Sequence, residues 1–104
     1  MDAHPGVVFR EGPAGRRAVL IGGPDVWEVI SAIRSVRTSE PTLTGGDLFD
    51  LVIAITGVTR RALDVAVSYY SDYPDEVDAL IDDAEGAEQA LEAAMDRRNS
   101  LLGT

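Results

Sequence analysis

Side chains that can perform acid–base or nucleophilic chemistry are few in this sequence of 104 residues. There is one histidine, His4, and there is no cysteine, so neither a disulfide framework nor a zinc–thiolate site can form. A serine nucleophile needs a base within hydrogen-bond reach, and nothing in the sequence places Ser68 or Ser71 near His4. We therefore expect that the protein is not an enzyme.

Two other groupings have the composition of a ligand site but not its pattern. Asp82, Asp83 and Glu85 are possible metal ligands, but calcium-binding loops need a glycine turn among their ligands. A helix face exposed to solvent explains these three acids better. The glycine pairs at 22–23 and 45–46 lack the spacing of a phosphate-binding loop. We expect neither a metal ion nor a cofactor.

All nine basic residues are arginines, and two groups of them suit the recognition of anions. Thr59, Arg60 and Arg61 stand where a helix is predicted to begin, and such side chains can reach the bases or phosphates of DNA. Arg97 and Arg98 are the only basic residues after Arg61, and a guanidinium can pair with a carboxylate through two parallel hydrogen bonds. Alternatively, this second pair only complements the carboxyl end of a helix dipole.

The first arginine group lies within residues 47–80, where the sequence predicts two apolar helices separated by residues 56–59. Gly57 can take the left-handed conformation that ends a helix, and Thr59 can accept a hydrogen bond from the first turn of the next one. Both helices have apolar residues at i, i+3, i+4 and i+7, namely Leu48, Leu51, Val52 and Ile55, then Leu63, Ala66, Val67 and Tyr70. This pattern predicts a helix-turn-helix motif, and an ordinary corner between two helices fits it equally well.

Upstream of this motif the sequence predicts a β-hairpin and one further helix. The β-branched and apolar runs 7–10 and 16–21 flank a loop that contains two glycines and a proline. Asp25, with Glu28 three residues later, forms a capping box at the start of a helix. Trp27 is expected in the core. The apolar face of this helix consists of Val26, Val29, Ile30 and Ile33.

The C-terminal part is predicted to be one long, acidic helix. Pro74 suits its first position, where the missing N–H is not needed. Its first turns, residues 77–84, can pack on the domain. Beyond Gly86 the apolar stripe thins to alanines plus Leu91 and Met95, too little apolar area to hold an isolated helix. We therefore divide the chain into a domain of residues 1–82 and a tail of residues 83–104 that frays alone and becomes ordered on a partner.

Three tyrosines, Tyr69, Tyr70 and Tyr73, end the second helix of the motif. That helix is apolar over so much of its surface that it must be buried from more than one side. Either the hairpin and the helix of residues 26–36 cover it, or a second chain does. In the second case the tyrosines form the interface of a two-fold homodimer.

Charge and length restrict the remaining possibilities. The net charge is −9, and residues 62–104 hold eleven acids against two arginines, so attraction to DNA should be weak. No apolar run approaches the ~20 residues of a membrane span, and no signal-peptide pattern is present, so we expect a cytoplasmic protein. The predicted fold is a small α+β domain, mostly α. It comprises an N-terminal hairpin, a three-helix unit with the helix-turn-helix, and a protruding C-terminal helix.

Two stretches of the chain resemble a known family. Residues 4–30 (HPGVVFREGPAGRRAVLIGGPDVWEVI) and 62–81 (ALDVAVSYYSDYPDEVDALI), with the acid-rich residues 88–102, resemble the VapB-type antitoxins of type II toxin–antitoxin pairs. These are related to a larger group of small bacterial helix-turn-helix domains of unassigned function. The resemblance implies a partner, a PIN-domain (VapC-type) ribonuclease toxin whose Mg²⁺–carboxylate site the antitoxin blocks. It also implies binding to operator DNA, through which the antitoxin regulates its own operon.

With such a partner, the tail would carry the inhibitory residues. Arg97 or Arg98 would pair with the carboxylates of the toxin, and Arg98 is favoured because it shares a stripe with Leu91. The apolar residues that would dock in a groove of the toxin are Leu91, Met95, Leu101 and Leu102. Two other functions fit the sequence. One is a stand-alone helix-turn-helix regulator whose tail only dimerises, and the other is an adaptor that binds neither DNA nor toxin.

Overall fold

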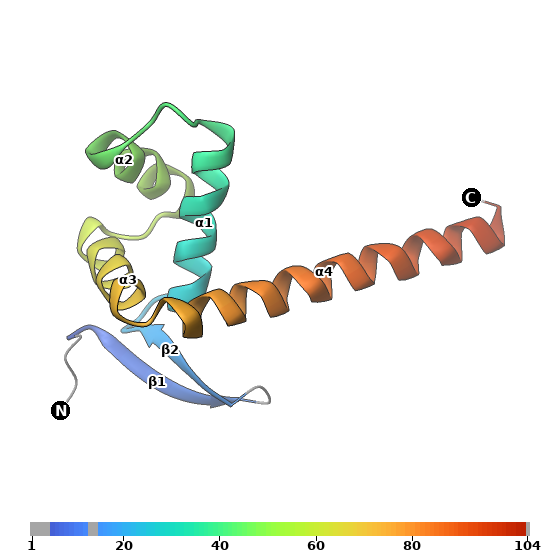
Figure 1. Ribbon diagram of the computed structural model, residues 1–104, viewed down its shortest axis with the longest axis horizontal. Helices are drawn as coiled ribbons and strands as arrows, with labels where there is room; N and C mark the ends of the chain where they lie inside the picture. Colours follow the sequence, from blue (N-terminus) through green and yellow to red (C-terminus); the bar gives the residue numbers. More distant parts are fainter. Residues whose placement is uncertain (1–4, 13–14, 104) are drawn as a thin grey trace.

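The computed structural model describes residues 5–12 and 15–103. A two-stranded hairpin is followed by four helices (Figure 1). The elements are β1 (Val7–Gly12), β2 (Gly15–Leu20), α1 (Val26–Ser39), α2 (Gly45–Thr56), α3 (Arg60–Asp72) and α4 (Pro74–Leu102). The predicted fold is confirmed: the protein is α+β and mostly α, with an N-terminal hairpin and a long C-terminal helix that protrudes from the domain.

The hairpin lies under the helices and contributes one face to the core. β1 and β2 are antiparallel, and Val7 lies opposite Leu20. Because side chains alternate across a strand, Val7, Ala18 and Leu20 share one face, and all three are buried. The middle of the predicted turn, residues 13–14, lies outside the described residues, as does His4.

Helix α1 begins with the predicted capping box. Glu28 Oε1 accepts a hydrogen bond from the Asp25 backbone N–H at 3.2 Å. The Asp25 carboxylate also pairs with Arg17 Nε at 2.6 Å and accepts from Trp27 Nε1 at 3.2 Å. Trp27, expected in the core, is only partly buried: it packs against the core while its indole N–H bonds the Asp25 carboxylate. The predicted inward face is confirmed for Val26, Val29 and Ile30, which are buried, and Ile33 is partly buried.

The two helices of the predicted motif, α2 and α3, form with the turn between them from the local signals that predicted them. Gly57 has a φ of 76°, and its N–H donates to Ile53 O at 2.9 Å, which ends α2. The Thr59 hydroxyl accepts from Ala62 N at 3.1 Å and caps α3. One residue of the predicted α2 stripe is not buried. Ile55 is 64% exposed, because it lies at a hollow between α1 and α2 that no other described element covers.

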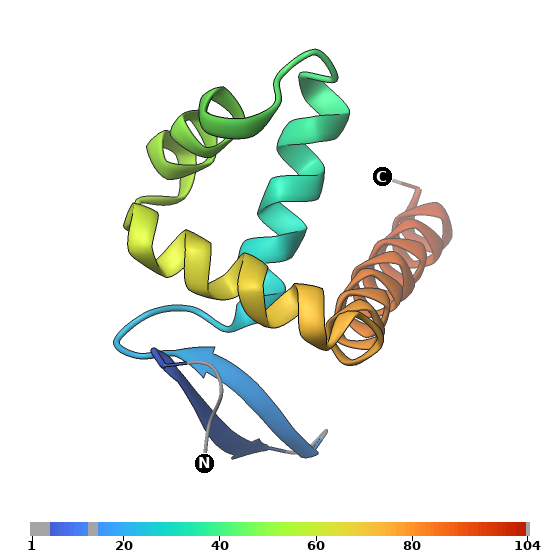
Figure 2. The ribbon, with the colours of Figure 1, turned by 60° about the vertical axis from the view of Figure 1, so that its left-hand side comes forward.

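Helix α1 is the centre of the packing. It contacts α2, α3, α4 and β2, and Figure 2 shows α3 lying across it above the hairpin. The most deeply buried large side chains come from all four helices and are Leu63, Ile81, Val26, Val29, Val52 and Val77. Val77 and Ile81 belong to the first turns of α4, so this helix is anchored in the core at one end.

Beyond that anchor α4 leaves the domain. It has 29 residues, which gives a length of about 43 Å at about 1.5 Å per residue. Every residue from 85 to 102 is exposed, and we call this segment the outer half of α4. We expected it to fray after Gly86, but the helix continues to Leu102. Its alanine, leucine, glutamate and arginine residues favour helix, and Gly103 closes it at a φ of 73°.

Candidate protein-interaction surface

The buried stripe that anchors α4 continues, uncovered, along its outer half. Residues seven apart lie close to one helical face, so Leu91 and Met95 follow the line of Val77 and Ile81. Leu91 is 62% exposed, Met95 55% and Leu102 59%. Leu101, beside this line, is also exposed. The apolar residues predicted to bind a toxin therefore lie together on one protruding segment and are not packed against any other element that the structure describes.

The two predicted arginines of this segment lie on different sides of the helix. At about 100° per residue, Arg98 falls on the stripe between Leu91 and Leu102, and Arg97 falls on the flank. None of the ion pairs that join described residues involves either guanidinium. The last turn of α4 holds no basic residue. The alternative role at the helix dipole therefore has little support, because that effect is confined to the last turn.

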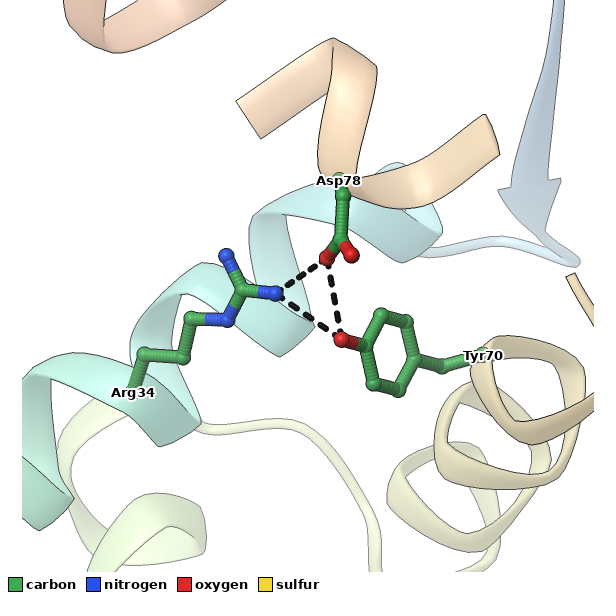
Figure 3. Close-up of polar contacts among 3 residues, drawn as sticks. All are labelled: Arg34, Tyr70 and Asp78. Atoms are coloured by element: carbon green, nitrogen blue, oxygen red, sulfur yellow. Dashed lines mark hydrogen bonds and ion pairs between the residues drawn. The ribbon is translucent and has the colours of Figure 1, made fainter. Parts of the chain in front are cut away.

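A polar cluster fixes the direction in which α4 leaves the domain (Figure 3). Arg34 of α1 donates to the Tyr70 hydroxyl of α3 at 2.9 Å and pairs with Asp78 of α4. The Tyr70 hydroxyl donates to Asp78 Oδ1 at 2.9 Å. The hydrogen bonds to Tyr70 and Asp78 raise the pKa of Arg34 above its ordinary value, so the guanidinium stays charged. Three helices thus meet in one cluster at the base of α4.

Two of the three tyrosines predicted to form a dimer interface instead make contacts within their own chain. Tyr69 is buried, and its hydroxyl donates to Glu76 Oε2 at 2.6 Å. Burial and this hydrogen bond raise the pKa of Tyr69. Tyr70 is partly buried in the cluster of Figure 3, and only Tyr73 is largely exposed. The wide apolar surface of α3 is therefore covered by α1, α4 and β2 of the same chain, the first of the two interpretations above.

The three residues predicted to contact DNA differ in availability. The Thr59 hydroxyl is occupied as the cap of α3. Arg60 pairs with Asp50 of α2, and its guanidinium lies 6.0 Å from the centre of the Phe49 ring. Arg61 is exposed at a hollow of about 350 Å³, and no hydrogen bond or ion pair joins its side chain to another described residue. Of the three, Arg61 is the one free to contact a phosphate.

The described residues that we considered for catalysis or metal binding do not form a site together, and His4 lies outside the described residues. Ser71 Oγ donates to Val67 O at 2.8 Å within its own helix, and Ser68 is exposed on α3. Asp82, Asp83 and Glu85 are exposed along α4. Among the described residues these groups have no common cavity.

A hollow of about 640 Å³ lies between residues 20–24 and the turn at 56–59. Most of its lining residues are apolar or glycine, and Glu28 is the only titratable lining residue among those described. Sequence reasoning missed it because its two walls are more than thirty residues apart in the chain. It offers a surface for contact but no group placed for chemistry.

Comparisons with protein-family models, with curated proteins and with solved structures find no match to this chain. Within the part of the chain that the structure describes, no helix has both the length and the apolar character needed to cross a membrane.

Proposed function

We propose that the protein is a non-enzymatic antitoxin that binds and neutralises a PIN-domain ribonuclease in the cytoplasm. The observation that carries this proposal is the uncovered stripe of Leu91, Met95 and Leu102 on a protruding helix. A row of exposed apolar side chains marks a protein-interaction surface, and amphipathic helices bind grooves through anchors at this spacing. The resemblance of the sequence to VapB-type antitoxins supplies the class of partner.

In this mechanism the stripe sets the position of Arg98. The apolar anchors enter a groove of the ribonuclease, and Arg98, on the same face, reaches the carboxylates that hold Mg²⁺ there. A guanidinium pairs with carboxylates in a bidentate manner and competes with the metal for their charge. Arg97, on the flank, contacts the rim of the site. The cluster of Arg34, Tyr70 and Asp78 keeps the base of α4 in one orientation, which reduces the conformational freedom lost on binding.

The test is co-expression with the protein encoded by the adjacent gene, followed by purification of any complex and an RNA-cleavage assay; the proposal expects that protein to be a PIN-domain ribonuclease. Deleting residues 88–104 should leave the domain folded, because every described residue of that segment, 88–103, is exposed. The deletion should also abolish inhibition. Leu91→Ala with Met95→Ala should weaken the complex through faster dissociation. Full inhibition by the truncated chain would show that the outer half of α4 is not the inhibitory element.

A second role, binding to operator DNA, is favoured by the helix-turn-helix and by the free Arg61 at the start of α3. Asp64, one turn further on, opposes an approach to phosphates, and the chain as a whole is acidic. Binding by the free protein is therefore weak and becomes stronger when a toxin joins two antitoxin units and raises the effective concentration. If no toxin co-purifies but the protein shifts operator DNA, the protein is instead a stand-alone regulator with a dimerising α4.

A further inference from the structure

Two hollows follow each other along one side of α1, and together we call them the α1 groove. The first, of about 640 Å³, is walled by the turn at residues 56–59, and the second, of about 440 Å³, is walled by α2. The α1 residues along them include Glu28, Ala32, Ser35, Val36 and Ser39, at i, i+4, i+7, i+8 and i+11. Residues at this spacing share one helical face, so the groove runs along most of α1.

The α1 groove is apolar and carries two acids. Ile21 at one end is 67% exposed and Ile55 in the α2 wall is 64% exposed, so the groove presents two large apolar side chains to solvent. Its charged lining residues among those described are Glu28 and Glu40, and both are exposed. They stand twelve residues apart, which is about 18 Å along α1. A segment that fits this groove must be apolar, of similar length, and positively charged.

The outer half of α4 has a face with these properties. From Leu91 to Leu102 it is about 16 Å long. At about 100° per residue, Arg98 lies on the stripe, and Arg97 and Leu101 lie to one side of it. The acids of the outer half lie to the other side of the stripe and are Glu85, Glu88, Glu92 and Asp96. The face that holds both arginines is therefore apolar and positive, and the acids point away from it.

We propose that a second copy of this chain docks the outer half of its α4 in the α1 groove. The apolar stripe fills the groove, and Arg97 and Arg98 approach Glu28 and Glu40. The helix cannot reach the groove of its own chain, because α4 is unbroken and α2 and α4 lie on different sides of α1 (Figure 2). Each copy has one groove and one outer half, so a reciprocal exchange about a two-fold axis closes the contact as a dimer.

Charge favours this occupant over the other candidates for the groove. Nucleic acid and anionic lipid would be repelled by Glu28 and Glu40. Two α4 helices that paired with each other in antiparallel order would set each acidic flank against that of the other copy. Each copy has a net charge of −9. With the acids in solvent, most of this repulsion acts over more than the Debye length of about 8 to 10 Å and is screened.

The contact joins one helix to one groove and is therefore small, so the chain should be monomeric when dilute and associate as its concentration rises. The inference goes beyond the proposed function and does not depend on it, because every measurement uses this protein alone. It adds one consequence: a ribonuclease that binds Leu91 and Met95 must displace the second copy.

The experiment is sedimentation velocity of the full-length protein over a range of concentrations. The groove variant is Ile55→Glu, the stripe variant is Leu91→Glu, and the matched control is Val8→Glu. All three replace an exposed apolar side chain by the same charge, but Val8 lies on the hairpin, outside both surfaces. Circular dichroism and thermal melts check that each variant is folded. Glu40→Gln is a second groove variant that changes only a charge.

The wild type and the control should associate alike. Each of the first two variants should weaken self-association by about tenfold or more, because a charge replaces an apolar anchor within the contact. Glu40→Gln should weaken it by about two- to fivefold, as expected for one exposed ion pair. An equal mixture of Ile55→Glu and Leu91→Glu should associate better than either alone, because the first retains an intact stripe and the second an intact groove.

Three results would overturn the inference. A wild type that stays monomeric up to about 1 mM does not form the contact. Normal self-association of Ile55→Glu and Glu40→Gln would show that the stripe pairs with another surface. Failure of the mixture to associate better than its components would show that the groove and the stripe do not bind each other.

Discussion

One helix, α4, offers a direct test of which part of its apolar stripe serves folding and which serves binding. Ile81 and Leu91 lie on the same side of it, but Ile81 is 1% exposed and Leu91 is 62% exposed. Truncation of a buried isoleucine to alanine costs about 3 kcal/mol, from lost transfer free energy and the cavity left behind. The same truncation at Leu91 should cost about 0.5 kcal/mol or less, because most of that side chain is already in water.

Urea denaturation measures both variants, with the fluorescence of the single tryptophan, Trp27, as the probe. Trp27 packs against the core, so its signal reports unfolding of the domain. Ile81→Ala should also lower the melting temperature by more than 10 °C, at about 4–8 °C per kcal/mol. Leu91→Ala should leave the melting temperature nearly unchanged and weaken only the complex with the partner. If Leu91→Ala destabilised the free protein by more than about 1 kcal/mol, the outer half would be packed in solution and would not be a free binding surface.

Three further predictions concern the backbone, the alkaline pH range and DNA. Gly57→Ala should lower the free energy of unfolding by about 1 kcal/mol, because Gly57 has a positive φ. Gly86 lies inside α4 with no atom near an added Cβ, so Gly86→Ala should raise the helicity of the protein. Because the pKa of Tyr69 is raised, its hydroxyl contributes fully to the stability of the fold below a pH of about 10, and this contribution is lost at higher pH. The free energy of unfolding of the wild type should therefore fall relative to that of Tyr69→Phe above that pH. In gel shifts with operator DNA, Arg61→Ala should lower the affinity and reduce the slope of log affinity against log salt concentration by about one. Arg60→Ala should have a smaller effect because Arg60 pairs with Asp50. Equal effects of the two substitutions would contradict the assignment of Arg61 as the arginine available to DNA.

The elements of this fold could be predicted from sequence because each begins or ends at a local signal. The capping box at Asp25, the left-handed Gly57 and the cap at Thr59 each act within four residues, so a single sequence is enough to recognise them. The exposure of Ile55 could not be predicted in this way. Periodicity shows which residues share a face but not whether another element covers that face.

The contacts that determine the candidate sites mostly join residues far apart in the sequence. Arg34 is 36 residues from Tyr70 and 44 from Asp78, so no local pattern relates them. No local pattern predicts the pair of Arg60 and Asp50 either, and this pair engages the guanidinium of Arg60, one of the residues predicted to contact DNA. Which residues of the outer half of α4 share a face could be predicted from sequence for the opposite reason: they are exposed and pack against no other described element, so helical spacing alone describes them.

The anchoring of α4 explains why its outer half is helical, contrary to our expectation. An isolated helix must first form a nucleus, which fixes several residues for one hydrogen bond, and this step makes short helices marginal. Here the first turns are already held by Val77, Ile81 and the contact of Asp78 with Arg34, so the outer half needs only propagation. Propagation is close to neutral for residues such as alanine, leucine and glutamate. A partner would therefore meet a preformed helix, and the anchors on its stripe would bind without the entropy loss of folding a disordered tail.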